Sequence, residues 1–127
     1  DHAALEVQVK GDNDETLLKA AQFFNDKEYE QSIPLLEAYL RSNPEDTEIQ
    51  MSLGIALLET EEEDLEKAAL IFEHVYQEDN IFKAKATWYL ALVNVKNNRN
   101  EEAKVYLEEI NQNSFYYSQA QKLLKKL

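Results

Sequence analysis

Small residues recur in this sequence at a spacing that paired helices explain. Two columns of small side chains stand 12 residues apart, or 14 in the middle copy, and a third column of large apolar side chains follows four residues later. The members are Ala20, Gly54 and Ala91 in the first column, Ser32, Ala68 and Ala103 in the second, and Leu36, Phe72 and Leu107 in the third. The second and third columns step by 36 and then 35 residues. A repeat of this length is typical of helical hairpins that stack in an array.

Narrow side chains at matching places let two antiparallel helices approach closely, and large apolar residues one turn later fill the space between them. One such pair cannot bury both of its apolar faces, so successive pairs stack and shield one another. The sequence has only two glycines and two prolines, too few for the many turns of a β-rich fold. It therefore predicts an all-α solenoid of antiparallel helix pairs.

Apolar periodicity and polar turn residues predict about seven helices. The expected ranges are 15–26, 29–42, 45–59, 64–78, 82–97, 100–111 and 115–126. Asn43 is expected to cap the third helix, with Pro44 at its first position. Pro34 falls inside the second helix and removes a backbone donor, so we expect it near the helix start on the exposed face.

Three stretches of the chain resemble the tetratricopeptide repeat family. The first runs from Phe23 to Leu40 and continues to Asn43 and Pro44. The others are Leu53-Gly54-Ile55-Ala56, followed by Ala68 and Phe72, and Trp88-Tyr89-Leu90-Ala91, followed by Ala103 and Leu107. The resemblance covers roughly residues 13 to 127 and implies a right-handed α-α superhelix. Its expected parts are a flexible arm at 1–13 and a single domain at 14–127, with repeats at about 14–46, 47–82 and 83–114 and a capping helix at 115–127.

The resemblance also implies a concave groove that binds a protein segment and is lined by the first helix of each repeat. The groove positions are apolar in this chain: Leu17, Ala21, Phe24, Met51, Ile55, Leu58, Trp88, Leu92 and Val95. Chaperone-binding members hold a carboxylate there with Lys, Asn and Arg, so we expect no such clamp. We expect a groove for an apolar strand or the apolar face of a helix. The alternative for each residue is burial in the core.

The first residues of the chain follow a different pattern from the rest. Leu5-Glu6-Val7-Gln8-Val9 alternates apolar and polar side chains with a period of two, and a flexible Gly11-Asp12-Asn13 comes next. This arm is a candidate to fill a groove in its own or a neighbouring molecule. The alternative is a terminus that is not fastened to the fold.

The charge of the chain argues against nucleic acid as a partner. The formal net charge is −12, whereas nucleic-acid binding depends on Lys and Arg side chains that neutralise phosphates. Through residue 80 the chain has 5 basic and 21 acidic side chains, and from residue 81 onward it has 8 and 4. This asymmetry either steers a charged partner or only maintains solubility.

Residue patterns for catalysis or metal binding are missing from the sequence. The chain has no cysteine, and its two histidines, His2 and His74, stand far apart. The acidic turn at 61–64 lacks the glycine and the alternating ligands of a calcium loop. Neither a glycine-rich phosphate loop nor an activated-serine motif occurs. We therefore expect no catalytic residues, no metal and no cofactor.

The expected function is that of a non-enzymatic scaffold that binds a protein or peptide through the concave groove. The alternative is a structural solenoid that forms homo-oligomers, or the soluble portion of a larger, membrane-anchored bacterial assembly. The Trp88–Ala91 stretch and the tyrosine-rich cap support that alternative, because they resemble envelope-associated bacterial repeat proteins. No signal sequence is recognised and no apolar run reaches the roughly 18 residues that span a bilayer, so we expect no direct membrane insertion. The sequence leaves the cellular location open.

Overall fold

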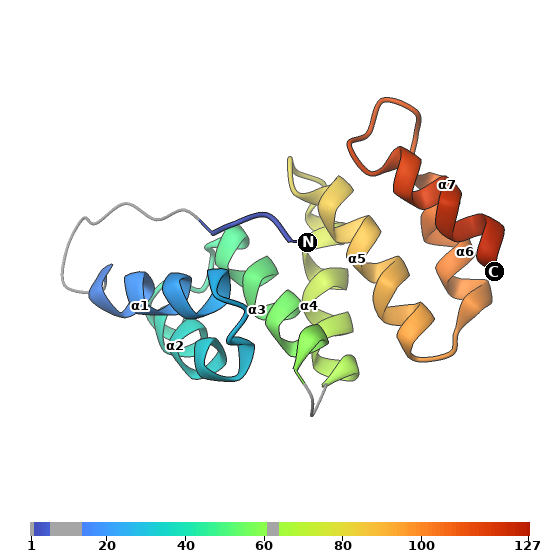
Figure 1. Cartoon of the computed structure of the whole chain (residues 1–127). Coiled ribbons are helices and arrows are strands. Elements are labelled where there is room, and N and C mark those ends of the chain that lie inside the picture. The colour runs from blue at the N-terminus through green and yellow to red at the C-terminus, as the bar shows by residue number, and fades with distance from the viewer. Residues whose placement is uncertain (1, 6–13, 61–63) are drawn as a thin grey trace. The chain divides into compact units, whose positions relative to one another are not determined.

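A computed structural model describes residues 2–5, 14–60 and 64–127 of the chain. Within those residues it contains seven α-helices and no strand (Figure 1). The helices are α1 (Asp14–Asn25), α2 (Tyr29–Ser42), α3 (Thr47–Glu59), α4 (Leu65–Glu78), α5 (Lys83–Lys96), α6 (Asn100–Glu109) and α7 (Tyr117–Lys126). The predicted all-α fold is confirmed, and every predicted helix end lies within two residues of the observed one.

The chain divides into two compact units, residues 1–64 and residues 65–127. In the first unit α1 packs on α2 and α2 on α3, and in the second unit α4 packs on α5, α5 on α6 and α6 on α7. Consecutive helices are therefore neighbours in each unit, as antiparallel pairing requires. The division falls inside the second predicted repeat, so the single domain at 14–127 and its superhelix stay predictions. None of the described helices combines the length and apolar character that crossing a bilayer demands.

The small-residue columns lie in the core of both units. Ala20, Ser32, Ala68, Ala91 and Ala103 are all 0% exposed, and Gly54 is also buried. The Ser32 hydroxyl donates a hydrogen bond to the Tyr29 carbonyl at 2.8 Å, so this buried hydroxyl has a hydrogen-bond partner. Leu36, Phe72 and Leu107 of the third column are 0% exposed as well. The predicted role of these columns in close helix packing is consistent with this complete burial.

The turns after α1 and α5 have the same backbone geometry. Lys27 has a φ of 63° and Asn98, 71 residues later, has a φ of 61°. The hydrogen bonds around them also match: Lys27 N to Phe24 O and Glu28 N to Phe23 O in the first turn, Asn98 N to Val95 O and Arg99 N to Asn94 O in the second. This is the double-bonded C-terminal motif that ends many helices in a left-handed residue. The α1–α2 and α5–α6 hairpins therefore repeat each other in structure as well as in sequence.

The left-handed residue in the first of these turns is costly, because a Cβ atom there approaches the following carbonyl. We expect Lys27→Gly to raise the free energy of unfolding by about 0.5–1 kcal/mol. Asn98→Gly is the matched control, and its gain is expected to be smaller because asparagine tolerates this conformation. Urea unfolding followed by circular dichroism measures both, and a larger gain for Asn98→Gly than for Lys27→Gly contradicts this account.

The junction between α2 and α3 differs from the prediction. Asn43 ends α2, where its backbone N–H donates to the carbonyls of Tyr39 and Leu40. The cap of α3 is Asp46, whose Oδ1 accepts a hydrogen bond from the Ile49 N–H at 3.3 Å. The prediction that Asn43 caps α3 with Pro44 at its first position is therefore wrong by three residues.

Pro34 lies within the first two turns of α2 and is exposed, as predicted. Because proline has no backbone N–H, one hydrogen bond in the first two turns of α2 is not formed, and this part of the helix is exposed to water. The proline is tolerated there because the carbonyl it leaves without a helical partner is not sealed in the core.

Candidate functional site

The predicted groove residues divide between the two units. The six in the first unit, Leu17, Ala21, Phe24, Met51, Ile55 and Leu58, are all at most 7% exposed. The three in the second unit, Trp88, Leu92 and Val95, are half-buried. Since Met51, Ile55 and Leu58 are no more than 1% exposed, they offer almost no surface to a partner in this structure. A single groove that joins all nine residues stays a prediction.

Trp88 packs against the last helices of the second unit. Its ring stacks on Tyr116 with centroids 5.9 Å apart and planes 16° apart, and it covers the core cluster of Ala91, Leu107, Ile110 and Ala120. Burial raises the pKa of the Tyr116 hydroxyl. Trp88 therefore anchors the residues that begin the capping helix, and only part of its ring remains for another contact.

A contact of the chain with its own N-terminal segment is the best-defined candidate site. Residues 2–5 lie outside any helix (Figure 1), and the Leu5 side chain is only 4% exposed. The Leu5 N–H donates to Asn25 Oδ1 at 2.8 Å, and Asn25 Nδ2 donates to the Leu5 carbonyl at 3.1 Å. The Asn25 carboxamide thus binds both backbone groups of one residue, as a partner strand does in an antiparallel pair.

The sequence left two interpretations of the N-terminal arm open, a segment that fills a groove and a terminus that is not fastened, and in the structure Leu5 contacts Asn25 of the first unit. The rest of the alternating pattern, residues 6–9, lies outside the described residues. Asn25 was missed, because the sequence shows it only as a polar residue at the end of a helix. The alternating arm was a usable signal, but nothing in the sequence gives the asparagine with which it pairs.

Aromatic rings build the wall beside this backbone contact. Phe24 and Tyr29 meet edge to face with ring centroids 5.5 Å apart. A cavity of about 60 Å³ lies between the rings and the N-terminal segment, and it is lined by His2, Ala3, Ala4, Phe24, Asn25, Lys27 and Tyr29. The site therefore combines a backbone clamp with a small apolar recess, the combination that holds an extended chain.

His2 occupies a second position of the same site. Its Nε2 lies 3.7 Å from Oε2 of Glu59, and its ring meets the edge of Tyr29 at a centroid distance of 6.3 Å. Burial, and then the negative charge of Glu59, raise the pKa of the Tyr29 hydroxyl. Next to it lies a cavity of about 270 Å³ lined by Lys27, Glu28, Tyr29, Glu30, Gln31, Glu59 and Thr60. Carboxylates outnumber cations around His2.

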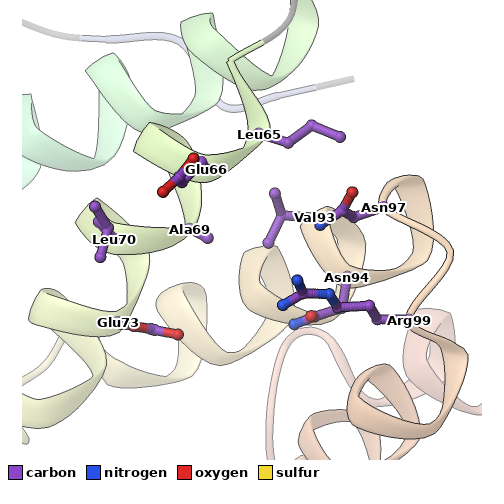
Figure 2. Close-up of a pocket in the computed structure, with 9 residues that line it drawn as sticks. All are labelled: Leu65, Glu66, Ala69, Leu70, Glu73, Val93, Asn94, Asn97 and Arg99. Atoms are coloured by element: carbon purple, nitrogen blue, oxygen red, sulfur yellow. The ribbon is translucent and has the colours of Figure 1, made fainter.

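A pocket of about 480 Å³ lies in the second unit (Figure 2). It is lined by Leu65, Glu66, Ala69, Leu70 and Glu73 on α4, by Val93 and Asn94 on α5, and by Asn97 and Arg99 in the turn that follows. Acidic side chains on one wall face amides and Arg99 on the other, so its charge favours no single class of ligand. The Asn94 amide already donates to the Leu90 carbonyl at 2.7 Å. The first unit is therefore the stronger candidate.

Metal-ligating groups do not gather in the part of the chain that the structure describes. No group of three His, Cys, Asp or Glu side chains with metal-binding geometry occurs among those residues. His74 lies on the surface with its side chain 63% exposed, and its Nε2 is 2.8 Å from Oε1 of Glu78 one turn later.

Tyr76 on α4 is tied to α6 by a hydrogen bond that its hydroxyl donates to Oε1 of Glu109. This bond, with burial and the charges of Glu109 and Tyr106, raises the pKa of Tyr76 from 10.0 to about 12. A raised pKa means that the neutral form is stabilised by folding, so its contribution is present below a pH of about 10 and disappears as the pH rises to about 12.

The free energy of unfolding is expected to fall as the pH rises from about 10 to about 12, and we expect it to fall less in the Tyr76→Phe variant. The variant lacks the hydroxyl that must ionise, so its unfolding free energy changes less from a pH of about 10 to about 12 than that of the unchanged chain. Urea unfolding at several pH values measures the difference, and an ultraviolet titration follows tyrosine ionisation directly. Identical pH profiles for the two chains rule out this role of Tyr76.

No family model, no curated protein and no solved structure matches this chain. What the protein does is therefore inferred from the contacts of its own residues.

Proposed function

We propose that the chain is a non-enzymatic, tetratricopeptide-like interaction module that binds an extended protein segment at Asn25. The observation that carries this proposal is the pairing of the Asn25 carboxamide with both backbone groups of Leu5, whose side chain is buried. The buried small residues and the duplicated turn support a repeated helical hairpin, the unit from which the expected array is built. The proposed function rests on this contact, and the packed helices of the first unit supply the base for it.

The contact has the chemistry of peptide recognition. Hydrogen bonds to the backbone give affinity whatever the side chain is, while a recess beside them selects the side chain. In this chain Asn25 provides the backbone bonds, and the side chain buried next to them is the aliphatic Leu5. The expected ligand is therefore an extended segment with one buried aliphatic residue, not the face of a helix, whose backbone groups are already paired.

The bound N-terminal segment is expected to exchange with a partner, because it is held weakly. Burial of Leu5 contributes about 1.5–3 kcal/mol, and each bond to Asn25 contributes about 0.5–1.5 kcal/mol. Ordering four residues costs about 1–2 kcal/mol for each, so the two sides nearly cancel. With an effective concentration of about 1 mM for a short flexible tether, the same segment supplied separately binds with a Kd near 1 mM. A partner that makes further contacts binds more tightly and displaces it.

The test uses the full-length chain with Leu5→Asp, which puts a charge where the aliphatic side chain is buried and releases the segment. A peptide of residues 1–10 is titrated into this labelled chain while the backbone amides of Lys27, Glu28 and Tyr29, next to the site, are followed by nuclear magnetic resonance. We expect binding with a Kd of about 1 mM, whereas the chain with its own Leu5 binds the peptide more weakly because the site is filled.

Asn25→Ala in the same Leu5→Asp chain removes both backbone bonds and is expected to abolish measurable binding, a change of about 1–3 kcal/mol. Asn94→Ala is the matched control, because that amide bonds only a carbonyl of its own helix. Peptide binding that survives Asn25→Ala, or no binding to any of these chains, refutes the proposed site.

Self-association by exchange of residues 2–5 between two copies is the second candidate function. The Leu5–Asn25 contact favours it, since the same bonds form whether the segment comes from the same copy or from another. Mass measurement over a range of concentrations distinguishes the two: a dimer that Leu5→Asp dissociates supports exchange, and a monomer at all concentrations supports an adaptor.

A further inference from the structure

We propose, on the basis of the function above, that the first unit selects a partner segment with a basic residue three positions before its buried aliphatic residue. The ligand class is an extended basic-x-x-aliphatic peptide, with arginine or lysine in the place that His2 occupies here. The basic side chain contacts Glu59 and Tyr29, and the aliphatic residue pairs with Asn25.

The geometry of His2 defines the first position of this motif. His2 stands three residues before Leu5, with Nε2 3.7 Å from the Glu59 carboxylate and its ring against the edge of Tyr29. Its side chain is 14% exposed and that of Glu59 is 33% exposed, so water screens the pair only partly. Glu59 is the last residue of α3, where the partial negative charge of a helix end also favours a cation.

The space around His2 fits a longer basic side chain. The cavity of about 270 Å³ shares Lys27 and Tyr29 with the smaller one beside His2, and Glu59 lines it as well. Its charged lining residues are Glu28, Glu30 and Glu59 against the single cation Lys27. An arginine or lysine at this position reaches further into this acidic space than an imidazole does, and arginine also stacks on the Tyr29 ring.

The two residues between the anchors contribute less to recognition. Ala3 and Ala4 are both exposed, although they border the cavity of about 60 Å³. The charge of the surrounding chain adds a long-range preference, because residues 1–64 hold 17 acidic and 4 basic side chains. Such a field attracts basic segments and repels acidic ones before contact.

The experiment titrates four peptides of residues 1–10 into the full-length Leu5→Asp chain at low salt. One has the sequence of the chain, and the others contain His2→Arg, His2→Ala or His2→Glu. We expect the arginine peptide to bind about 3- to 10-fold more tightly than the alanine peptide, and the glutamate peptide to bind most weakly. Glu59→Gln in the protein removes the advantage of arginine, whereas the matched variant Glu48→Gln, on the same helix but at its other end, retains it.

The outcomes separate this inference from the function on which it rests. Equal affinities for the arginine, alanine and glutamate peptides, all of them lost with Asn25→Ala, overturn the basic-x-x-aliphatic preference and leave the peptide site intact. An arginine advantage that Glu59→Gln leaves unchanged also overturns it. Absence of binding by all four peptides refutes both proposals together.

Discussion

Phe72→Ala is expected to lower the free energy of unfolding by about 3–5 kcal/mol, the range for loss of a fully buried aromatic ring. Phe72 is 0% exposed, and its ring stacks on Tyr89 with centroids 5.4 Å apart, which joins α4 to α5 inside the second unit. Removing the ring loses the burial of a large apolar surface and leaves a cavity that close-packed helices cannot fill.

Leu70→Ala is the control for this prediction, because Leu70 lies two residues earlier on α4 and is 61% exposed. Its expected cost is below about 0.5 kcal/mol. Urea unfolding followed by far-ultraviolet circular dichroism measures both variants. A cost for Phe72→Ala below about 1 kcal/mol, or a cost equal to that of Leu70→Ala, contradicts the packing described for the third column.

The helices and their buried columns were predictable from sequence because they depend on local spacing. Small residues that recur 12 or 14 residues apart mark the places where two helices touch, and all six are buried in the structure. The polar turns between them, such as the one that ends at Lys27, fix where each helix stops. These features lie within single helical hairpins, so a single sequence contains the information that fixes them.

The cap of α3 was not predictable, because a tertiary contact decides between two candidates. Asn43 and Asp46 both have side chains that cap helices well. Asp46 caps α3 because the Tyr39 hydroxyl donates a hydrogen bond to its Oδ2 at 2.8 Å and holds the carboxylate between α2 and α3. The capping preferences of asparagine and aspartate do not reveal that contact.

The candidate site was only half predictable for a related reason. The alternating pattern around Leu5 indicated a segment unlike the helices, but its partner Asn25 stands 20 residues away at a helix end. The apolar groove positions posed the opposite problem, since periodicity predicts an apolar face and does not say what covers it. Met51, Ile55 and Leu58 are covered almost completely, whereas Trp88 keeps part of its surface.

Ala103→Leu is expected to destabilise the second unit by about 1–3 kcal/mol through overpacking. Ala103 is 0% exposed at the start of α6, and α6 packs on α5, where Ala91 of the first column is also 0% exposed. A larger side chain at this position holds the two helix axes apart, so the loss arises from separation of the pair and not from a cavity.

Val105→Leu provides the matched control on the same helix, because Val105 is 60% exposed and an added methylene there meets water. If the columns are equivalent, Ala20→Leu has the same effect on α1 and α2 in the first unit that Ala103→Leu has on α5 and α6 in the second. Amide hydrogen exchange distinguishes the effects of Ala20→Leu and Ala103→Leu, because each substitution is expected to speed exchange first in the helices of its own unit. Equal stability of Ala103→Leu and Val105→Leu means that narrow side chains are not what lets these helices pair, and the account of the repeat then fails at its first step.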